Sequence, residues 1–502
     1  MSQQPQHPVT PGRTYADSTV ILLLTKLAGA AVFWALEVAL VRVAEPSEWE
    51  TLARFLTLVT TLAIGQLGLS DSVVYFAARS ESVATGLRLT VRTSAILAVV
   101  GAAIAIPFGT IPWLSELILG SGAMIAATPL AIFMASELAL TPIPSLLVGT
   151  RHVRMASVIA VVARLPPSVG ALVAVVAGFG IHGALYAMAV GSLLSLIVSW
   201  MLVPVVLRER GGATTVPIGE QLSYALPVGM MRLVQRGSVQ LDKYVVMVLF
   251  SEAVYGTYYL GANEFAVPGL VCGAAMTVLM ADLVESAKER DSGRFVALWH
   301  ASIEKIALVT LPVAMFIFLF AEPIFVAVYG EAHGWAGGQF RIFTLIVLLR
   351  VTNYGTVSLA LGQPRVPLTA AAIALGINAA LAYPFTMWMG ISGAAVATVT
   401  GVLLSTFYTL SAIRRVLGVP FGTVMPFGRY VRTLSVATAA LVPAAPLLLL
   451  DLPAAVCFGL GAAVYLAAYV SLLTITGTWS RDDRAFLLGL ARLAPLRRRP
   501  GS

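Results

Sequence analysis

Fourteen long apolar runs divide this sequence, and each is long enough to cross a lipid bilayer as a helix. The chain has 502 residues, of which 58% are apolar and only 11% are charged, and its mean hydropathy is +0.89. A soluble domain has ~45–50% apolar and ~25% charged residues, whereas a membrane-spanning helix needs ~20 consecutive apolar ones. These values exclude a soluble enzyme and a disordered chain. They predict an all-α polytopic membrane protein of about 14 transmembrane helices.

Charged or Pro/Gly-rich breaks separate the expected spans, and none of the breaks is long enough for a soluble domain. The expected spans cover residues 18–42, 51–78, 88–112, 122–148, 154–178, 181–207, 222–250, 253–283, 301–328, 339–361, 366–388, 391–413, 430–450 and 452–476.

Lys and Arg gather in every second loop and in both terminal tails. The other loops hold only Arg42, Arg54 and Arg341 and carry acidic residues instead. Because short cytoplasmic loops are rich in Lys and Arg, we expect a multi-pass protein with both termini in the cytoplasm, which requires an even number of spans. The net charge of +8 has the same origin, so nucleic acid is not an expected partner.

One sequence pattern occurs twice, 210 positions apart. Gly180–Ala184 reads GIHGA and Gly390–Ala394 reads GISGA, which aligns the sixth span with the twelfth. A shift of six spans keeps the orientation across the membrane, so we expect two six-helix lobes related by a parallel pseudo-twofold repeat. The expected parts are a polar cytoplasmic tail (1–17), an N-lobe of spans 1–6 (18–210), a C-lobe of spans 7–12 (211–416), an accessory pair, spans 13–14 (417–476), and a basic cytoplasmic tail (477–502).

Polar and cationic residues gather inside the expected spans, most of all on span 7. A charge at the centre of a bilayer costs at least ~2.5–3.5 kcal/mol, and guanidinium groups bind phosphate through two parallel hydrogen bonds. This set therefore predicts a cationic cavity that holds an anion, although each charge could instead pair with an acid and lock two helices together. The candidate substrate-binding residues are Arg232, Arg236, Lys26, Arg164, Lys243, Arg350, Gln235 and Gln240.

Five carboxylates in the spans have two possible roles. A carboxylate in a medium of low dielectric can carry a proton or bind a sodium ion, and it can also serve as the partner of a structural ion pair. The sequence leaves this choice open. The ion-coupling candidates are Asp71, Glu37, Glu137, Glu264 and Asp242.

Motifs of catalysis are missing from the sequence. It contains no GxxxxGK[ST], no HExxH and no GxSxG, the signatures of ATP hydrolysis, zinc proteolysis and serine hydrolysis. We therefore expect no enzyme activity, no catalytic residue, no metal site and no resident cofactor.

Several short stretches form a pattern whose order and spacing are informative, namely Leu67–Arg79, Tyr224–Pro227, Leu241–Lys243, Val254–Tyr258, Leu361–Arg365 and Gly390–Ala395. Together they resemble one family of transporters, the bacterial flippases of polysaccharides and lipid-linked oligosaccharides in the multidrug/oligosaccharidyl-lipid/polysaccharide exporter superfamily. The resemblance covers about residues 18–415, and spans 13 and 14 match the additional pair of fourteen-helix members. Glu50 departs from the pattern, because the family usually has Gly there.

The resemblance implies a substrate and a mechanism. The substrate would be an undecaprenyl-pyrophosphate-linked oligosaccharide, moved from the cytoplasmic to the outer leaflet of the bacterial inner membrane by alternating access. Coupling to a proton or sodium gradient or to the membrane potential is also implied. Arg232 and Arg236 would contact the anion, and Lys26 and Arg164 would face them from the other lobe. The implied partners are the lipid-linked glycan, the bilayer and other membrane proteins of glycan assembly.

Three other interpretations remain open. A flippase of the peptidoglycan lipid precursor also has fourteen spans and cavity arginines. A multidrug/cation antiporter of the same superfamily has an acidic cavity and usually twelve spans, which fits the intramembrane arginines less well. A membrane scaffold or enzyme subunit of a glycan-assembly complex would not need clustered charge on the first helix of each repeat.

Overall fold

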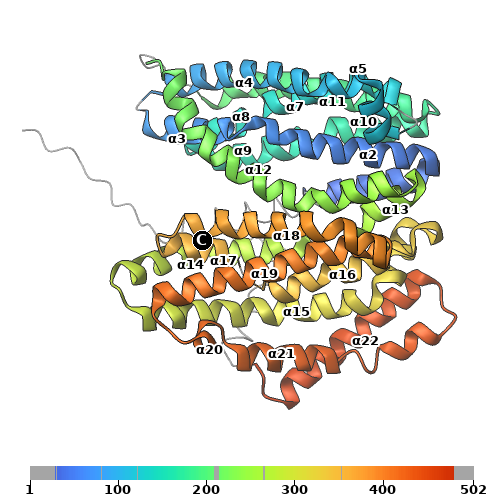
Figure 1. The fold of residues 1–502 in the computed structure, drawn as a ribbon, viewed down its shortest axis with the longest axis vertical. Coiled ribbons are helices and arrows are strands. Elements are labelled where there is room, and N and C mark those ends of the chain that lie inside the picture. The colour runs from blue at the N-terminus through green and yellow to red at the C-terminus, as the bar shows by residue number, and fades with distance from the viewer. Residues whose placement is uncertain are drawn as a thin grey trace, which may run out of the picture. The chain divides into compact units, whose positions relative to one another are not determined.

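The described part of the chain is built from helices (Figure 1). The structure is a computed structural model that describes residues 29, 31–80, 82–120, 123–207, 214–263, 266–351 and 353–479. Among these residues, nine helices are long and apolar enough to cross a membrane, or ten if one bent pair counts as a single span. The prediction of an all-α polytopic membrane protein is therefore confirmed, and the number fourteen stays a prediction.

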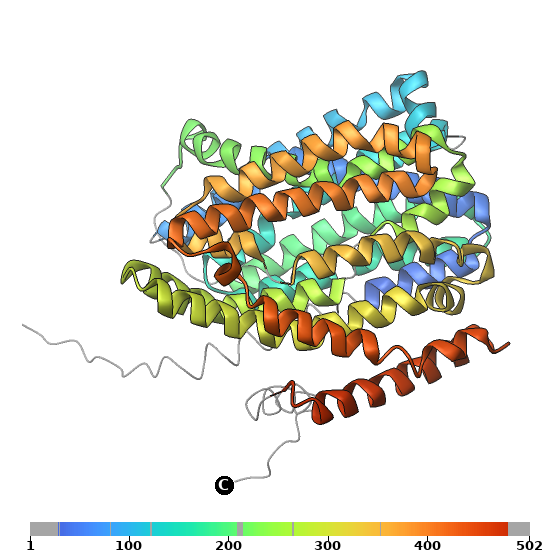
Figure 2. The same cartoon turned by 60° about the horizontal axis from the view of Figure 1, so that its bottom comes forward.

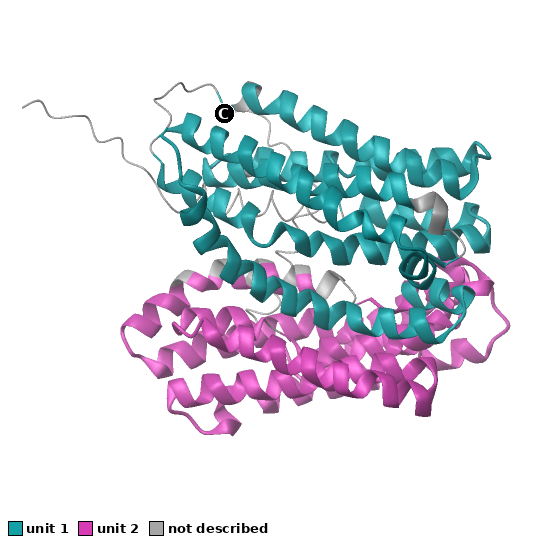
Figure 3. Ribbon diagram, turned by 45° about the horizontal axis from the view of Figure 1, so that its top comes forward, with its two compact units in different colours: residues 1–259 teal, residues 260–502 magenta. Residues whose placement is uncertain are grey.

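The chain forms two compact units, residues 1–259 and 260–502, coloured separately in Figure 3. In the first unit, an initial helix covers residues 31–43. The further helices of this unit are α2 (Pro46–Leu62), η1 (Ala63–Gln66), α3 (Leu69–Arg79), α4 (Val83–Ala105), α5 (Pro107–Thr110), α6 (Pro112–Leu119), α7 (Ala123–Leu140), α8 (Pro142–Gly149), α9 (Val153–Val162), α10 (Leu165–Val176), α11 (Gly180–Val206) and α12 (Ile218–Leu249), and α13 (Glu252–Gly261) crosses the boundary.

The second unit contains the remaining helices, seen from another side in Figure 2. They are α14 (Ala266–Lys288), α15 (Ser292–Tyr329), η3 (Glu331–His333), α16 (Ala336–Leu349), α17 (Tyr354–Ala360), α18 (Arg365–Met389), α19 (Ile391–Leu417), α20 (Phe421–Val424), α21 (Phe427–Ala439), η4 (Ala445–Leu449) and α22 (Ala454–Ile475).

Helix α12 belongs to the first compact unit, where it packs against α2, η1 and α3. The repeat in the sequence assigned the same segment to the C-lobe, which was expected to begin at residue 211. The two divisions rest on different criteria, because the units follow packing and the lobes follow sequence similarity. The expected lobes stay a prediction. Because α12 packs within the first unit, the candidate site on α12 is described as part of that unit.

Proline residues divide several of the expected spans into two helices. Pro142 is the first residue of α8, directly after α7, and Pro166 lies in the first turn of α10, directly after α9. Proline lacks the amide hydrogen that a helix interior requires but fits its first turn, so each proline starts a new helix at these points. In α15 the backbone leaves helical geometry at Phe320, three residues before Pro323, for the same reason.

The repeated GIxGA pattern has the same backbone geometry in both copies. Gly180 and Gly390 have φ angles of 62° and 64°, in the left-handed region that favours glycine. The helices that follow, α11 and α19, each pack against the preceding helix, α10 and α18. At Gly191 and Gly401, again 210 positions apart, a Cβ atom would lie 2.6 Å and 2.7 Å from backbone atoms of that neighbouring helix. Glycine therefore allows the same close helix crossing in both copies.

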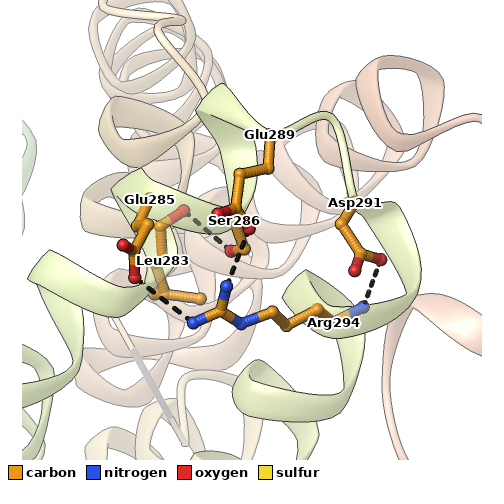
Figure 4. Close-up of polar contacts among 6 residues, drawn as sticks. All are labelled: Leu283, Glu285, Ser286, Glu289, Asp291 and Arg294. Atoms are coloured by element: carbon orange, nitrogen blue, oxygen red, sulfur yellow. Dashed lines mark hydrogen bonds and ion pairs between the residues drawn. The ribbon is translucent and has the colours of Figure 1, made fainter.

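A polar network stabilises the turn between α14 and α15 (Figure 4). The carboxylate of Asp291 accepts a hydrogen bond of 2.8 Å from the backbone amide of Arg294 and so caps the N-terminus of α15. The guanidinium of Arg294 forms ion pairs with Glu289 at 2.7 Å and with Glu285 at 3.2 Å. The exposed ion pairs contribute little to stability, so the cap is the main local restraint.

We expect Asp291→Ala to loosen the first turn of α15. Loss of an N-cap hydrogen bond costs ~0.5–2 kcal/mol, which should increase amide hydrogen exchange at Arg294 and its neighbours, measured by mass spectrometry. Asp291→Asn is the matched control, because asparagine caps helices equally well. Unchanged exchange in the alanine variant would show that the cap does not restrain this turn.

Candidate functional site

The candidate site is built where α12 crosses a break in the second expected span. Leu67 and Gly68 have φ angles of 42° and 73°, and the helices on either side of them are bent by 42°. A Cβ atom at Gly68 would lie 2.3 Å from the carbonyl oxygen of Ala225, and one at Gly229 would lie 2.4 Å from the carbonyl carbon of Leu67. Two glycines thus bring the backbone of α12 directly against the break.

One turn after this contact, an ion pair joins α12 to α3. Nη2 of Arg232 lies 2.6 Å from Oδ1 of Asp71, and the two side chains are 40% and 27% exposed. Asp71 is in the first turn of α3, where the helix dipole stabilises a negative charge. The ion pair is therefore favourable but open on one side, and the sequence analysis had placed both residues in the candidate site.

Two further arginines lie near this ion pair. Arg236 is exposed and donates a hydrogen bond of 3.2 Å to the carbonyl of Thr60, and both Arg232 and Arg164 are close enough to repel its charge. Arg164 also attracts the carboxylate of Glu137. The first unit therefore brings together three of the predicted arginines and two of the predicted carboxylates, with one cation in excess.

Breaks in the helices place two of the predicted arginines. Arg164 is the N-cap residue of α10, at the break after α9, and Arg350 is the C-cap residue of α16, at the break before α17. Both side chains are exposed, and Arg350 is 3.5 Å from the hydroxyl of Ser405. Helix ends leave backbone polar groups without partners, and transporters build their binding sites from such interrupted helices.

The C-terminal half of α12 carries three buried polar residues. Asp242 is fully buried, and its Oδ2 accepts a hydrogen bond of 2.8 Å from the hydroxyl of Tyr258, while its Oδ1 has no partner among the described residues. Lys243 and Gln240 are 3% and 8% exposed. Helical spacing places Lys243 on the face of Arg232, but Lys243 is buried, whereas the side chain of Arg232 is 40% exposed.

A glutamine that sequence reasoning missed joins the N-terminal end of α12 to α3 and α4. Gln221 is fully buried and donates hydrogen bonds to the hydroxyls of Ser72 at 2.9 Å and Thr93 at 2.8 Å. It accepts a hydrogen bond of 2.7 Å from Arg92, which also donates to the carbonyl of Val216 at 2.8 Å. Gln221 lies next to Glu220, just before the expected span 222–250, and no signal in the sequence identifies it.

Arg54 was also missed, because the sequence analysis counted it only as a loop charge. It is 4% exposed and donates hydrogen bonds of 3.4 Å to the carbonyls of Leu117 and Met247. Its guanidinium lies 5.6 Å from the ring centre of Tyr255, and Glu252 attracts its charge. Arg54 thus links α2, α6 and α12 at the end of the unit opposite Gln221.

The remaining predicted residues do not join this cluster. Gln235 is exposed on α12, and Glu37 is half-buried in the helix over residues 31–43. Arg350 lies in the second unit. Lys26 and Glu264 lie outside the described residues.

The fold is shared with solved transporters. A lipid II flippase MurJ in an inward closed conformation matches with a TM-score of 0.72 at 13% identity, covering 91% of this chain and 98% of that one. An inward-facing multidrug resistance MATE family transporter of the MOP superfamily matches with a TM-score of 0.63 at 16% identity, covering 77% of this chain and 94% of the other. A MOP superfamily transporter from Pyrococcus furiosus matches with a TM-score of 0.52 at 16% identity, covering 80% and 94%.

These similarities define the class of protein, a multi-pass membrane protein with the fold of the MOP superfamily transporters. A family profile described as "Polysaccharide biosynthesis protein" matches residues 39–336, more than half of the chain. The chain belongs to this polysaccharide biosynthesis family, which confirms the predicted resemblance. No curated protein sequence matches it significantly.

We expect Gly229→Ala to destabilise the first unit. The new methyl group would meet the backbone of Leu67, which cannot move away as a flexible side chain could, and overpacking of this kind costs ~1–3 kcal/mol. Thermal unfolding in detergent should show a lower midpoint. Gly219→Ala on the same helix is the matched control, because a Cβ atom there has open space and alanine favours a helix by ~1 kcal/mol. Equal midpoints for the two variants would contradict the close contact.

Proposed function

We propose that this protein is a flippase that moves an undecaprenyl-pyrophosphate-linked oligosaccharide, the precursor of a cell-surface polysaccharide, from the cytoplasmic to the outer leaflet of the bacterial inner membrane. The observation that carries the proposal is the group formed by Arg232, Arg236 and Arg164 beside an interrupted span. Membership of the polysaccharide biosynthesis family and the fold of MOP superfamily transporters support it.

The charges of the cluster favour a phosphate ligand. Arg236 is repelled by Arg232 and Arg164, and an anion between them would relieve this repulsion. Pyrophosphate presents several oxygens, which guanidinium groups bind through paired hydrogen bonds. In this mechanism the pyrophosphate displaces Asp71 from Arg232, and Asp71 takes its place again after release, so that Arg232 keeps an anionic partner throughout the cycle.

The surface of α12 next to these arginines suits a substrate that has a lipid tail. Leu226, Met230 and Leu233 are 45%, 55% and 39% exposed. A polyprenyl chain could contact these side chains while its pyrophosphate binds the guanidinium groups.

Arg232→Ala/Arg236→Ala should abolish flipping. Purified protein would be reconstituted with a fluorescent undecaprenyl-pyrophosphate oligosaccharide, and the label that reaches the far leaflet would be measured. Removal of two charge-assisted contacts of ~1.5–3 kcal/mol each should lower transport by at least roughly a hundredfold. Arg232→Lys/Arg236→Lys keeps the charge without paired donation and should retain part of the activity.

Arg414→Ala/Arg415→Ala, in the last turn of α19, is the control for the loss of two charges and should flip the lipid normally. All variants must first show a wild-type unfolding midpoint. Transport that survives in Arg232→Ala/Arg236→Ala would discard the proposed site. A peptidoglycan lipid precursor as the preferred substrate, or efflux of a cationic dye without lipid flipping, would replace the proposed function by the corresponding alternative.

We further propose that Asp242 couples transport to a cation gradient. Its buried carboxylate keeps one oxygen without a hydrogen-bond partner among the described residues, and a proton or a cation bound there would supply that partner.

Asp242→Asn should therefore make flipping independent of the imposed proton or sodium gradient, while Tyr258→Phe, which removes only the hydrogen bond to Oδ2, should preserve the dependence. The measurement is the flipping rate with and without each gradient. A full response to the gradient in Asp242→Asn would assign coupling to another group.

A further inference from the structure

A polar cavity lies where the accessory helices meet α15, entirely within the second unit. It has a volume of about 130 Å³, whereas a site for one water molecule needs only ~10–15 Å³ by the same measure. Helices α21 and α22 both pack against α15 here (Figure 1). The residues that matter for its chemistry are Glu304, Leu308, Arg429, Arg432, Thr478 and Trp479.

The sequence around the cavity predicts that it lies at the level of a membrane surface. On α15 the charged pair Glu304 and Lys305 precedes the long apolar part of the helix, and on α22 the apolar run ends at Ile475, which is 79% exposed. Tryptophan is enriched at the interface between lipid and water, and Trp479 lines the cavity just beyond that run. The distribution of Lys and Arg in the sequence predicts that this side is cytoplasmic.

Two arginines and one glutamate line this cavity. Arg429 forms an ion pair with Glu304, and their side chains are 68% and 20% exposed. Arg432 donates a hydrogen bond to the carbonyl of Thr476, at the end of α22. The lining of the cavity therefore carries two positive charges and one negative charge. Both arginines are exposed. Leu308 adds an apolar contact on the side of α15.

We propose that this cavity binds the phosphodiester headgroup of an anionic membrane lipid of the cytoplasmic leaflet. Basic pockets between transmembrane helices on this side attract such headgroups, and two arginines in one cavity provide the paired hydrogen bonds that a phosphate accepts. The lipid would link α21 and α22 to α15 through its phosphate. This proposal uses residues of the second unit alone and does not depend on the proposed function.

Native mass spectrometry of the intact protein tests the proposal. Phosphatidylglycerol should remain bound under conditions that remove phosphatidylcholine, and Arg429→Gln/Arg432→Gln should lower its affinity by at least roughly tenfold. Arg414→Gln/Arg415→Gln is the matched control, since it removes the same charge outside the cavity, and it should change the affinity less than twofold. An equal loss of affinity for phosphatidylglycerol in the two double variants would show that only general surface charge matters, and would overturn the proposed site.

Glu304→Gln provides a second test that does not remove an arginine. It takes away the carboxylate that competes for Arg429, so phosphatidylglycerol should bind more tightly, and unchanged or weaker binding would contradict the proposal. Inorganic phosphate distinguishes the source of the anion. Millimolar phosphate should leave the bound lipid in place, whereas displacement of the lipid would show a site for a soluble anion and overturn the assignment to a lipid.

Discussion

The interaction between Arg232 and Asp71 satisfies a charge that a transmembrane helix could not otherwise carry at low cost. Arg232 lies within an expected span, where an isolated cation costs at least ~2.5–3.5 kcal/mol. Asp71 lies 2.6 Å away because the preceding span breaks at Leu67 and Gly68 and starts a new helix there. The break gives the carboxylate a position in the first turn of α3, where the helix dipole favours its charge.

The features that sequence reasoning predicts well are those that depend on a single segment. Apolar runs identify helices because a bilayer leaves few other solutions for the backbone. The paired glycines at positions 180 and 390 are visible because a left-handed backbone needs the same residue in both copies. The charged face of α12 follows from helical spacing, and the partners Arg232 and Asp71 were both singled out as polar residues inside spans.

The sequence alone could not show which part of a helix face is covered by neighbouring helices. Helical spacing places Lys243 near the face of Arg232, yet Lys243 is 3% exposed and Arg236 is exposed, because neighbouring helices cover only part of α12. Gln221 and Arg54 interact with residues more than sixty positions away in the sequence, so no local pattern reveals them. The compact unit to which α12 belongs is likewise a property of packing, which the internal repeat does not contain.

The composition of α12 also has a consequence for the assembly of the protein in the membrane. Within the described part of the chain, α12 is a 32-residue helix that is not among the helices apolar enough to cross a bilayer unaided. Its charges are acceptable once Asp71 and the carbonyl of Thr60 are beside them. Both partners are synthesised well before α12, so the ribosome delivers this helix to a membrane that already contains them. The partners of the charges on α12 are therefore present in the chain before α12 itself is made, so α12 can pair its charges as soon as it enters the membrane.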